Sequence, residues 1–139
     1  MISIRYAIDT DKAFWFTLDA HMAESEFYKK VRDKQGYILL DDGVPKGILR
    51  YNLFWDEIPF CTLLFIDSSF QRLGFGQMLM EVWEDDMRTK NYGMVMTSTR
   101  ADESAQHFYR KLGYKDCGGL MLDVPGFEQP MEIFLTKAL

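Results

Sequence analysis

The stretch FIDSSFQRLGFGQMLMEVWEDDM, residues 65–87, joins the end of an apolar run to a helical pattern through a turn with two glycines. The apolar run stops at Asp67, and Gly74 and Gly76 lie where the helical pattern begins. A helix start carries unpaired backbone N–H groups and the positive end of the helix dipole, and therefore binds anions such as phosphate. Glycines there remove the Cβ atoms that would keep a pyrophosphate away from those N–H groups. The stretch predicts either a phosphate-binding loop or a tight strand-to-helix turn.

Two common nucleotide-binding motifs do not fit this glycine segment. A Walker loop needs Gly-Lys-Ser/Thr, whereas Gln77 and Met78 follow Gly76. A dinucleotide fingerprint needs a third glycine where this chain has Leu79, and it belongs to an early strand–helix–strand unit. The segment here lies past the middle of the chain, so neither motif accounts for it.

The segments on either side predict one mixed α/β domain over residues 1–139. Apolar and alternating runs favour strands at residues 2–7, 36–40, 45–54, 60–66, 92–98, 114–123 and 131–138. Helical spacing favours helices at residues 9–22 and 24–34, directly after the glycines, and at 101–113. The Asp-Asp-Gly run at 41–43 is typical of a hairpin turn. A strand, a helix and a strand around the glycines predict a parallel pair with a right-handed crossover.

The composition bounds the class of protein. Hydrophobic residues make up 47% and aromatic residues 15%, which is typical of a globular domain and leaves room for a homodimer surface. The net charge of −5 and the pI of about 5.0 argue against nucleic acid as a partner and are compatible with a cationic one. The N-terminus lacks the pattern of a signal peptide, and no apolar run approaches the roughly 20 residues of a membrane span. We therefore expect a cytoplasmic protein without membrane contact.

The cysteines and histidines predict no metal site. Cys61 and Cys117 show no CxxC spacing, and we interpret both as buried thiols in a reducing compartment. His21 lies near two glutamates, but these are too few ligands for a metal. His107 is expected on the surface, because it faces away from Tyr109 on a helix.

Two segments together resemble the GCN5-related N-acetyltransferase (GNAT) family. QRLGFG, residues 71–76, is similar to the family's Gln/Arg-x-x-Gly-x-Gly/Ala signature. DESAQHFYRKLGY, residues 102–114, resembles its later Asn-x-x-Ala-x-x-Phe-Tyr-x-Lys-x-Gly-Phe segment. The spacing of the two segments and the order of elements along the whole chain also suit the family. The resemblance implies a twisted mixed sheet of about seven strands, flanked by four helices, with a central parallel strand pair.

The resemblance also implies acetyl-CoA as the acetyl donor and suggests which residues would hold it. The backbone of Leu64, Phe65 and Ile66 would pair with the pantetheine arm like an added strand. The loop that starts at Gln71 would hold the pyrophosphate through the N–H groups of Arg72, Leu73, Gly74, Phe75, Gly76 and Gln77. Phe108 would pack beside the cofactor or in the core. Asp102 stands where the family often has asparagine, and an ionised aspartate cannot donate a hydrogen bond, so Asp102 could act only as a helix cap.

The implied reaction is acetyl transfer to a primary amine of a small molecule or peptide by direct attack in a ternary complex. An amine with a pKa of about 10 is roughly 0.1% neutral at pH 7, so a base or a proton-conducting water chain is useful. Glu57, in the turn before the strand at 60–66, is our first choice of base, with a solvated turn as the alternative. A backbone N–H of residues 64–66 would stabilise the oxyanion.

Tyr109 matches the family's tyrosine near the thioester sulfur, where it would give a proton or a hydrogen bond to the departing thiolate. It also belongs to an apolar helix stripe, so a plain core role is the alternative. Residues 52–60, the first two helices and residues 118–130 are expected to line the acceptor site, and residues 97–99 could border it. A non-catalytic acyl-CoA sensor of the same fold remains the alternative to an enzyme.

Overall fold

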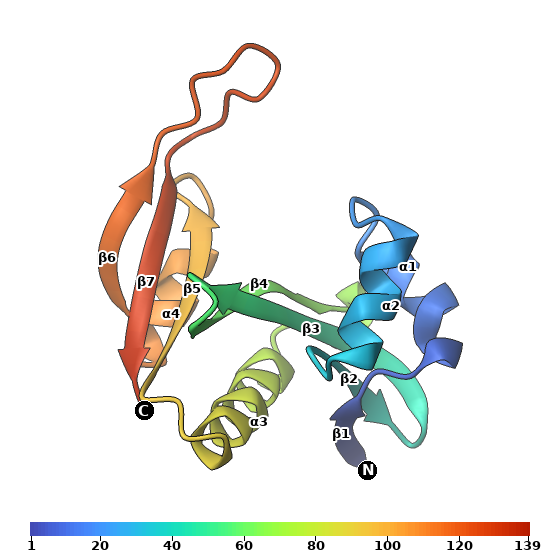
Figure 1. Ribbon diagram of the computed structural model, residues 1–139. Helices are drawn as coiled ribbons and strands as arrows, with labels where there is room; N and C mark the ends of the chain where they lie inside the picture. The colour runs from blue at the N-terminus through green and yellow to red at the C-terminus, as the bar shows by residue number, and fades with distance from the viewer.

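The computed structural model describes all 139 residues as a seven-stranded sheet with four α-helices (Figure 1). The strands are β1 (Ile2–Tyr6), β2 (Gly36–Asp41), β3 (Val44–Phe54), β4 (Ile58–Ile66), β5 (Met94–Arg100), β6 (Lys115–Leu120) and β7 (Glu132–Ala138). The helices are α1 (Lys12–Leu18), α2 (Glu24–Arg32), α3 (Phe75–Thr89) and α4 (Ala105–Lys111), with 3-10 turns η1 (Asp9–Asp11) and η2 (Ser68–Phe70). None of the helices is long and apolar enough to cross a membrane.

The strand order is β1-β2-β3-β4-β5-β7-β6, and β4 and β5 form the parallel pair. All other neighbours are antiparallel. The predicted mixed α/β fold with a central parallel pair is therefore confirmed. The predicted hairpin is also present: Asp42 and Gly43 both have positive φ, of 49° and 82°, as a tight two-residue turn between β2 and β3 requires.

The parallel pair separates almost at once. Only Phe60 with Met96 and Cys61 with Thr97 are in register between β4 and β5. On its other side β4 carries a β-bulge, because β3 pairs Arg50 with Leu63 and then Tyr51 with Cys61, which leaves one extra residue on β4. A bulge bends its strand. The two halves of the sheet diverge from this point, as Figure 1 shows. The C-terminal part of β4 consequently has an edge without a partner strand.

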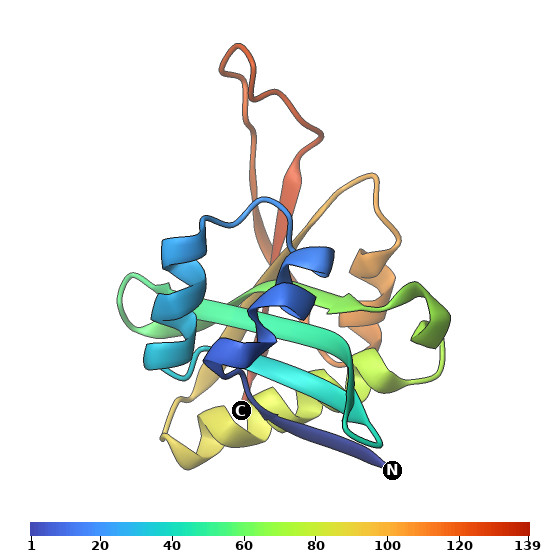
Figure 2. The ribbon, with the colours of Figure 1, turned by 90° about the vertical axis from the view of Figure 1, so that its right-hand side faces the viewer.

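Two hydrophobic clusters lie on opposite faces of the sheet. Alternate residues of β2 point to each face, so that Leu39 joins the larger cluster and Ile38 the smaller. The larger cluster is built around α3, whose buried residues include Leu79, Trp83 and Met87 at helical spacing. The smaller cluster contains Trp15, Phe27 and Ile48 under α1 and α2. Figure 2 shows α1 and α2 in front of the sheet and α3 below it.

The two helices predicted at residues 9–22 and 101–113 are shorter than expected, and in each an aspartate at the affected end is held by an arginine. Asp19 ends α1: its buried carboxylate accepts hydrogen bonds from Trp15 and from Arg50 of β3, at 3.1 and 2.7 Å. Asp102 was expected at the start of a helix, but it pairs with Arg100 at 3.0 Å, and α4 begins only at Ala105. Residues 101–104 form turns instead.

The prediction that both cysteines are buried is wrong for Cys117, which is exposed, whereas Cys61 is buried as expected. Cys117 belongs to β6, an edge strand in which every residue is exposed. The connection between β6 and β7 extends away from the body of the molecule (Figures 1 and 2). It carries several exposed apolar side chains, namely Met121, Val124, Phe127 and Met131.

Candidate active site

Three adjoining cavities follow the gap between the two halves of the sheet. The largest, of about 540 Å³, is lined by His21, Cys61, Thr62, Leu63, Leu64, Thr97, Ser98, Thr99, Arg100, Glu103, Ala105, Tyr109, Gln129 and Glu132. The middle one, of about 340 Å³, lies between the free edge of β4 and α4, and the third, of about 360 Å³, lies at the start of α3. Leu64, Ala105 and Tyr109 line both the first and the second. Ile66, Gln71 and Phe108 line both the second and the third, so the three form one groove.

The glycine segment forms the far end of this groove. Gly74 precedes α3 with a φ of 84°, a left-handed conformation that favours glycine. No backbone N–H from Gln71 to Gln77 donates a hydrogen bond to another backbone group, since the first helical bond of α3 comes from Met78. The side-chain amide of Gln71 donates a hydrogen bond to the backbone carbonyl of Ile66 at 2.9 Å, which ties this loop to the end of β4. The loop therefore presents a row of unpaired donors at the positive end of a helix.

Gly76 faces the groove directly. A Cβ atom at this position would lie 3.5 Å from Phe108 and 3.8 Å from Leu64. The sequence-predicted residues Leu64, Phe65 and Ile66 lie on the free edge of β4, and Phe108 faces them from α4. The structure thus brings together the loop, the strand edge and Phe108, three of the features that the sequence motifs single out.

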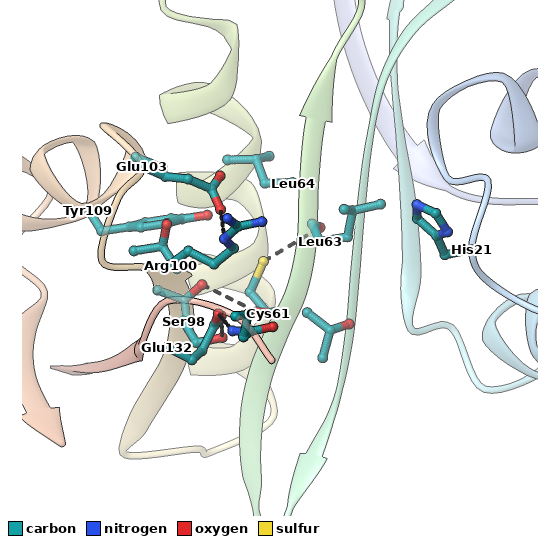
Figure 3. Close-up of a pocket in the computed structure, with 14 residues that line it drawn as sticks. His21, Cys61, Leu63, Leu64, Ser98, Arg100, Glu103, Tyr109 and Glu132 are labelled. Carbon is teal, nitrogen blue, oxygen red and sulfur yellow. Dashed lines mark hydrogen bonds and ion pairs between the residues drawn. The ribbon is translucent and has the colours of Figure 1, made fainter. Parts of the chain in front are cut away.

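Tyr109 lies where the middle cavity meets the largest one (Figure 3). It is 7% exposed and packs edge-on against Phe108 and Tyr114, so it belongs to the core as well as to the cavity walls. Burial raises the pKa of the Tyr109 phenol above its ordinary value, and the nearby Cys61 raises it further, whereas Thr97 acts in the opposite direction. The phenol is therefore protonated at neutral pH and can donate a hydrogen bond or a proton.

Cys61 forms part of the same wall. Its thiol is buried, and its Sγ lies 3.6 Å from the Leu63 carbonyl. Burial raises the pKa of this thiol to about 12. Because a nucleophilic cysteine must be a thiolate, Cys61 is unsuited to carry an acetyl group covalently near neutral pH.

Two of the residues singled out from the sequence lie apart from the groove. Glu57 is in the exposed turn between β3 and β4 and lines none of the three cavities. Asp102 is half-exposed, and both of its carboxylate oxygens accept hydrogen bonds from Arg100. The predicted strand end at residues 97–99 does line the largest cavity.

Sequence reasoning assigned no part in the site to Glu103, and it overlooked Glu132 altogether. Both glutamates line the largest cavity, in which His21 forms part of the opposite wall (Figure 3). The Glu132 carboxylate accepts from Ser98 Oγ at 2.7 Å and from Gln129 Nε2 at 3.1 Å. One signal was available: in the run MEIFLTKA, a glutamate alternates with Ile133 and Leu135, so it had to face the opposite side of the strand from the core.

The groove fits an acyl-CoA molecule. The free edge of β4 offers main-chain groups for an extended arm, and the row of N–H groups before α3 offers donors for a pyrophosphate. Gly76 leaves room for close approach between them. No group of three or more His, Cys, Asp or Glu residues is arranged to hold a metal ion.

Comparison with known families agrees with this arrangement. The sequence pattern of the acetyltransferase (GNAT) family matches residues 4–114. The chain belongs to this family. No curated protein matches the chain in sequence.

Solved GNAT structures share the fold closely at low sequence identity. Ard1 from Thermoplasma volcanium has a TM-score of 0.85 and 18% identity, covering 99% of this chain and 97% of that one. A ribosomal-protein-alanine N-acetyltransferase from Brucella melitensis has a TM-score of 0.83 and 16% identity, covering 99% of both chains. A GNAT family acetyltransferase from Elizabethkingia anophelis with acetyl-CoA bound has a TM-score of 0.77 and 16% identity, covering 99% of this chain and 98% of that one. The ligand of that structure is consistent with acetyl-CoA as the donor.

Proposed function

We propose that this protein is an N-acetyltransferase that moves the acetyl group of acetyl-CoA to a primary amine of a small molecule or peptide. The observation that carries the proposal is the position of Tyr109, a protonated phenol at the junction of the cofactor groove with the largest cavity. A donor at this junction faces the place where a thioester and an amine would meet. Membership of the GNAT family supports the same reaction.

The chain would bind and orient its cofactor through main-chain groups. The N–H groups of residues 72–77 would hold the pyrophosphate, and the edge formed by Leu64, Phe65 and Ile66 would align the arm beside Phe108. When bound, acetyl-CoA supplies the thioester that is attacked. A backbone N–H of residues 64–66 would donate to the developing oxyanion.

The transfer would proceed in one covalent exchange. The neutral amine nitrogen forms a bond to the thioester carbonyl carbon, and the carbon–sulfur bond breaks. The sulfur leaves as a thiolate, which Tyr109 protonates or stabilises by a hydrogen bond. The proton lost by the amine passes to a base or to water. Glu57 stays the base inferred from the sequence; because it lines none of the three cavities, the proton of the amine would have to reach it through a chain of water molecules.

Two measurements test this proposal together. Release of the CoA thiol from acetyl-CoA is followed with and without a panel of primary amines, and mass spectrometry identifies any acetylated product. We expect thiol release that depends on the amine, with one acetyl group added per thiol. Acetyl-CoA binding without amine-dependent release from any member of the panel would contradict the proposal and favour a non-catalytic acyl-CoA sensor.

A further inference from the structure

Glu132 lies on the face of the sheet away from α4. Along β7 it alternates with Ile133 and Leu135, which face the larger core cluster, and so it faces the other side. Ser98 on β5 is flanked by the buried Thr97 and Thr99 and also faces that side, where its hydroxyl reaches Glu132. The largest cavity is therefore lined from both faces of the sheet, with Tyr109 on one and Glu132 on the other.

The Glu132 carboxylate forms no ion pair within the protein, although Arg100 of β5 is its cross-strand neighbour. Its carboxylate is partly buried, and both hydrogen-bond donors that reach it, Ser98 and Gln129, are neutral. No lysine, arginine or histidine nitrogen forms an ion pair with it. By contrast, each of the buried carboxylates has a cationic partner: Asp11 has Arg5, Asp19 has Arg50 and Glu84 has Lys137. A partly buried anion without a cation is costly unless a ligand supplies one.

The one cationic side chain in the cavity wall is already engaged. Arg100 donates two hydrogen bonds to Asp102, at 3.2 and 3.0 Å, and forms an ion pair with Glu103 at 3.7 Å. Its charge is thus directed to these two carboxylates rather than to Glu132. The cavity wall thus carries two carboxylates, Glu103 and Glu132, and one guanidinium, so its formal charge is negative with His21 counted as neutral.

We propose that Glu132 selects acceptors that carry a second positive charge beside the reacting amine. The proposal rests on the proposed function and names the class of acceptor for that site. The reacting amine would lie in the gap of the sheet, near Tyr109. The second group, an ammonium or guanidinium, would pair with Glu132 on the side of the cavity that Gln129 also lines, across from His21. The cavity volume of about 540 Å³ falls in the range of small-molecule sites, roughly 300–1,000 Å³.

Calorimetric titration tests this pairing without relying on turnover. Diaminobutane and butylamine are titrated into the CoA-bound protein and into its Glu132→Gln variant. An amide of the same shape can still accept from Gln129 and donate to Ser98, so the variant keeps its fold, which a thermal melt verifies. We expect the Kd of diaminobutane to rise roughly ten- to one-hundredfold, as for loss of a hydrogen bond to a charged group. The Kd of butylamine should change less than about twofold, because it lacks the second charge.

The matched control is Glu128→Gln, the same substitution four residues earlier, on the connection between β6 and β7. Glu128 is exposed and outside the cavity, where its carboxylate accepts a hydrogen bond from the Gly126 N–H, so this variant should bind diaminobutane as the natural protein does.

A short peptide with lysine in second position, compared with one bearing norleucine there, shows whether the second charge can come from a peptide. In the natural protein, equal affinity for diaminobutane and butylamine, with no preference for the lysine peptide, would overturn the proposal. So would a Glu132→Gln variant that loses no affinity. Binding through Glu132 without acetyl transfer would support the proposal and count against the proposed function instead.

Discussion

Tyr109 is the single residue on which the proposed chemistry depends most. Replacing it with phenylalanine removes the proton donor and keeps the ring in the core. We expect kcat to fall about 10²- to 10⁴-fold, the range of general acid–base catalysis, while the KM for acetyl-CoA stays nearly constant. Steady-state kinetics measure both. Because burial raises the pKa of this phenol above its ordinary value of 10.0, kcat should not decline on the alkaline side until the pH exceeds about 10.

Tyr114→Phe is the matched control for this variant. Tyr114 is also buried and packs edge-on against Tyr109 at 5.8 Å, but its hydroxyl donates to Glu84 at 2.7 Å and lines no cavity of the groove. Its loss should lower stability without lowering kcat in the folded protein. If Tyr109→Phe retained full kcat, the assignment of Tyr109 as the proton donor would be wrong.

Single residues also show which parts of the candidate site could be predicted from the sequence alone. Tyr109 and Gly76 could be singled out because they belong to short sequence motifs, and the structure places both in the walls of the groove. Glu132 was not singled out, because only the pairing of β5 with β7 brings the Ser98 hydroxyl to its carboxylate and places both in the cavity wall. Glu57 was chosen for its place before β4, but a turn position does not fix the direction in which a side chain points.

At the scale of elements, the variant Gly76→Val tests whether the junction of β4 and α3 binds acetyl-CoA. The added side chain would point at Phe108 and Leu64 and fill the passage between the middle and third cavities. We expect the Kd for acetyl-CoA, measured by calorimetry, to rise roughly tenfold or more, while the free energy of unfolding changes by less than about 1 kcal/mol. Gly74 is less suitable for this test, because its positive φ would add backbone strain.

Gly93→Val provides the comparison for Gly76→Val. Gly93 lies before β5, outside the groove, and a Cβ there would have no neighbour within 4 Å. Its replacement should leave acetyl-CoA binding unchanged. Equal affinities for all three proteins would refute our interpretation of the glycine loop.

The elements themselves were largely predictable, since each strand and helix has its own periodicity. The errors fall at helix ends, where an aspartate is held by an arginine that is distant for Asp19 and two residues away for Asp102. Asp19 ends α1 because Arg50 and Trp15 bind its carboxylate, and no local pattern reveals such a pair. The separation of β4 from β5 was equally hidden, because the bulge that accompanies it depends on the register with β3.

On the scale of the whole molecule, α3 connects the two diverging halves of the sheet. Glu84 on α3 is buried and accepts hydrogen bonds from Tyr114 and from Lys137 of β7, at 2.7 and 2.8 Å. Glu84→Ala would leave the Lys137 ammonium without its partner in a largely buried place. We expect this variant to lose about 3–5 kcal/mol of unfolding free energy, measured by urea denaturation.

Glu81→Ala, on the exposed face of the same helix, should change the unfolding free energy by less than about 0.5 kcal/mol. A double variant with leucine at both Glu84 and Lys137 should recover much of the loss, because replacing a buried ion pair by apolar groups is often neutral. A Glu84→Ala variant as stable as Glu81→Ala would show that the halves do not depend on this contact.

The early parting of β4 and β5 has a consequence for the order of events in catalysis. A sheet that opens between two strands is accessible from both faces, so the donor and the acceptor can enter the site from different sides of the sheet. Both substrates can therefore be bound at once, before any product leaves, and each product can leave on the side from which its substrate entered. Initial-rate plots for the proposed reaction should therefore show intersecting lines rather than the parallel lines of a ping-pong scheme.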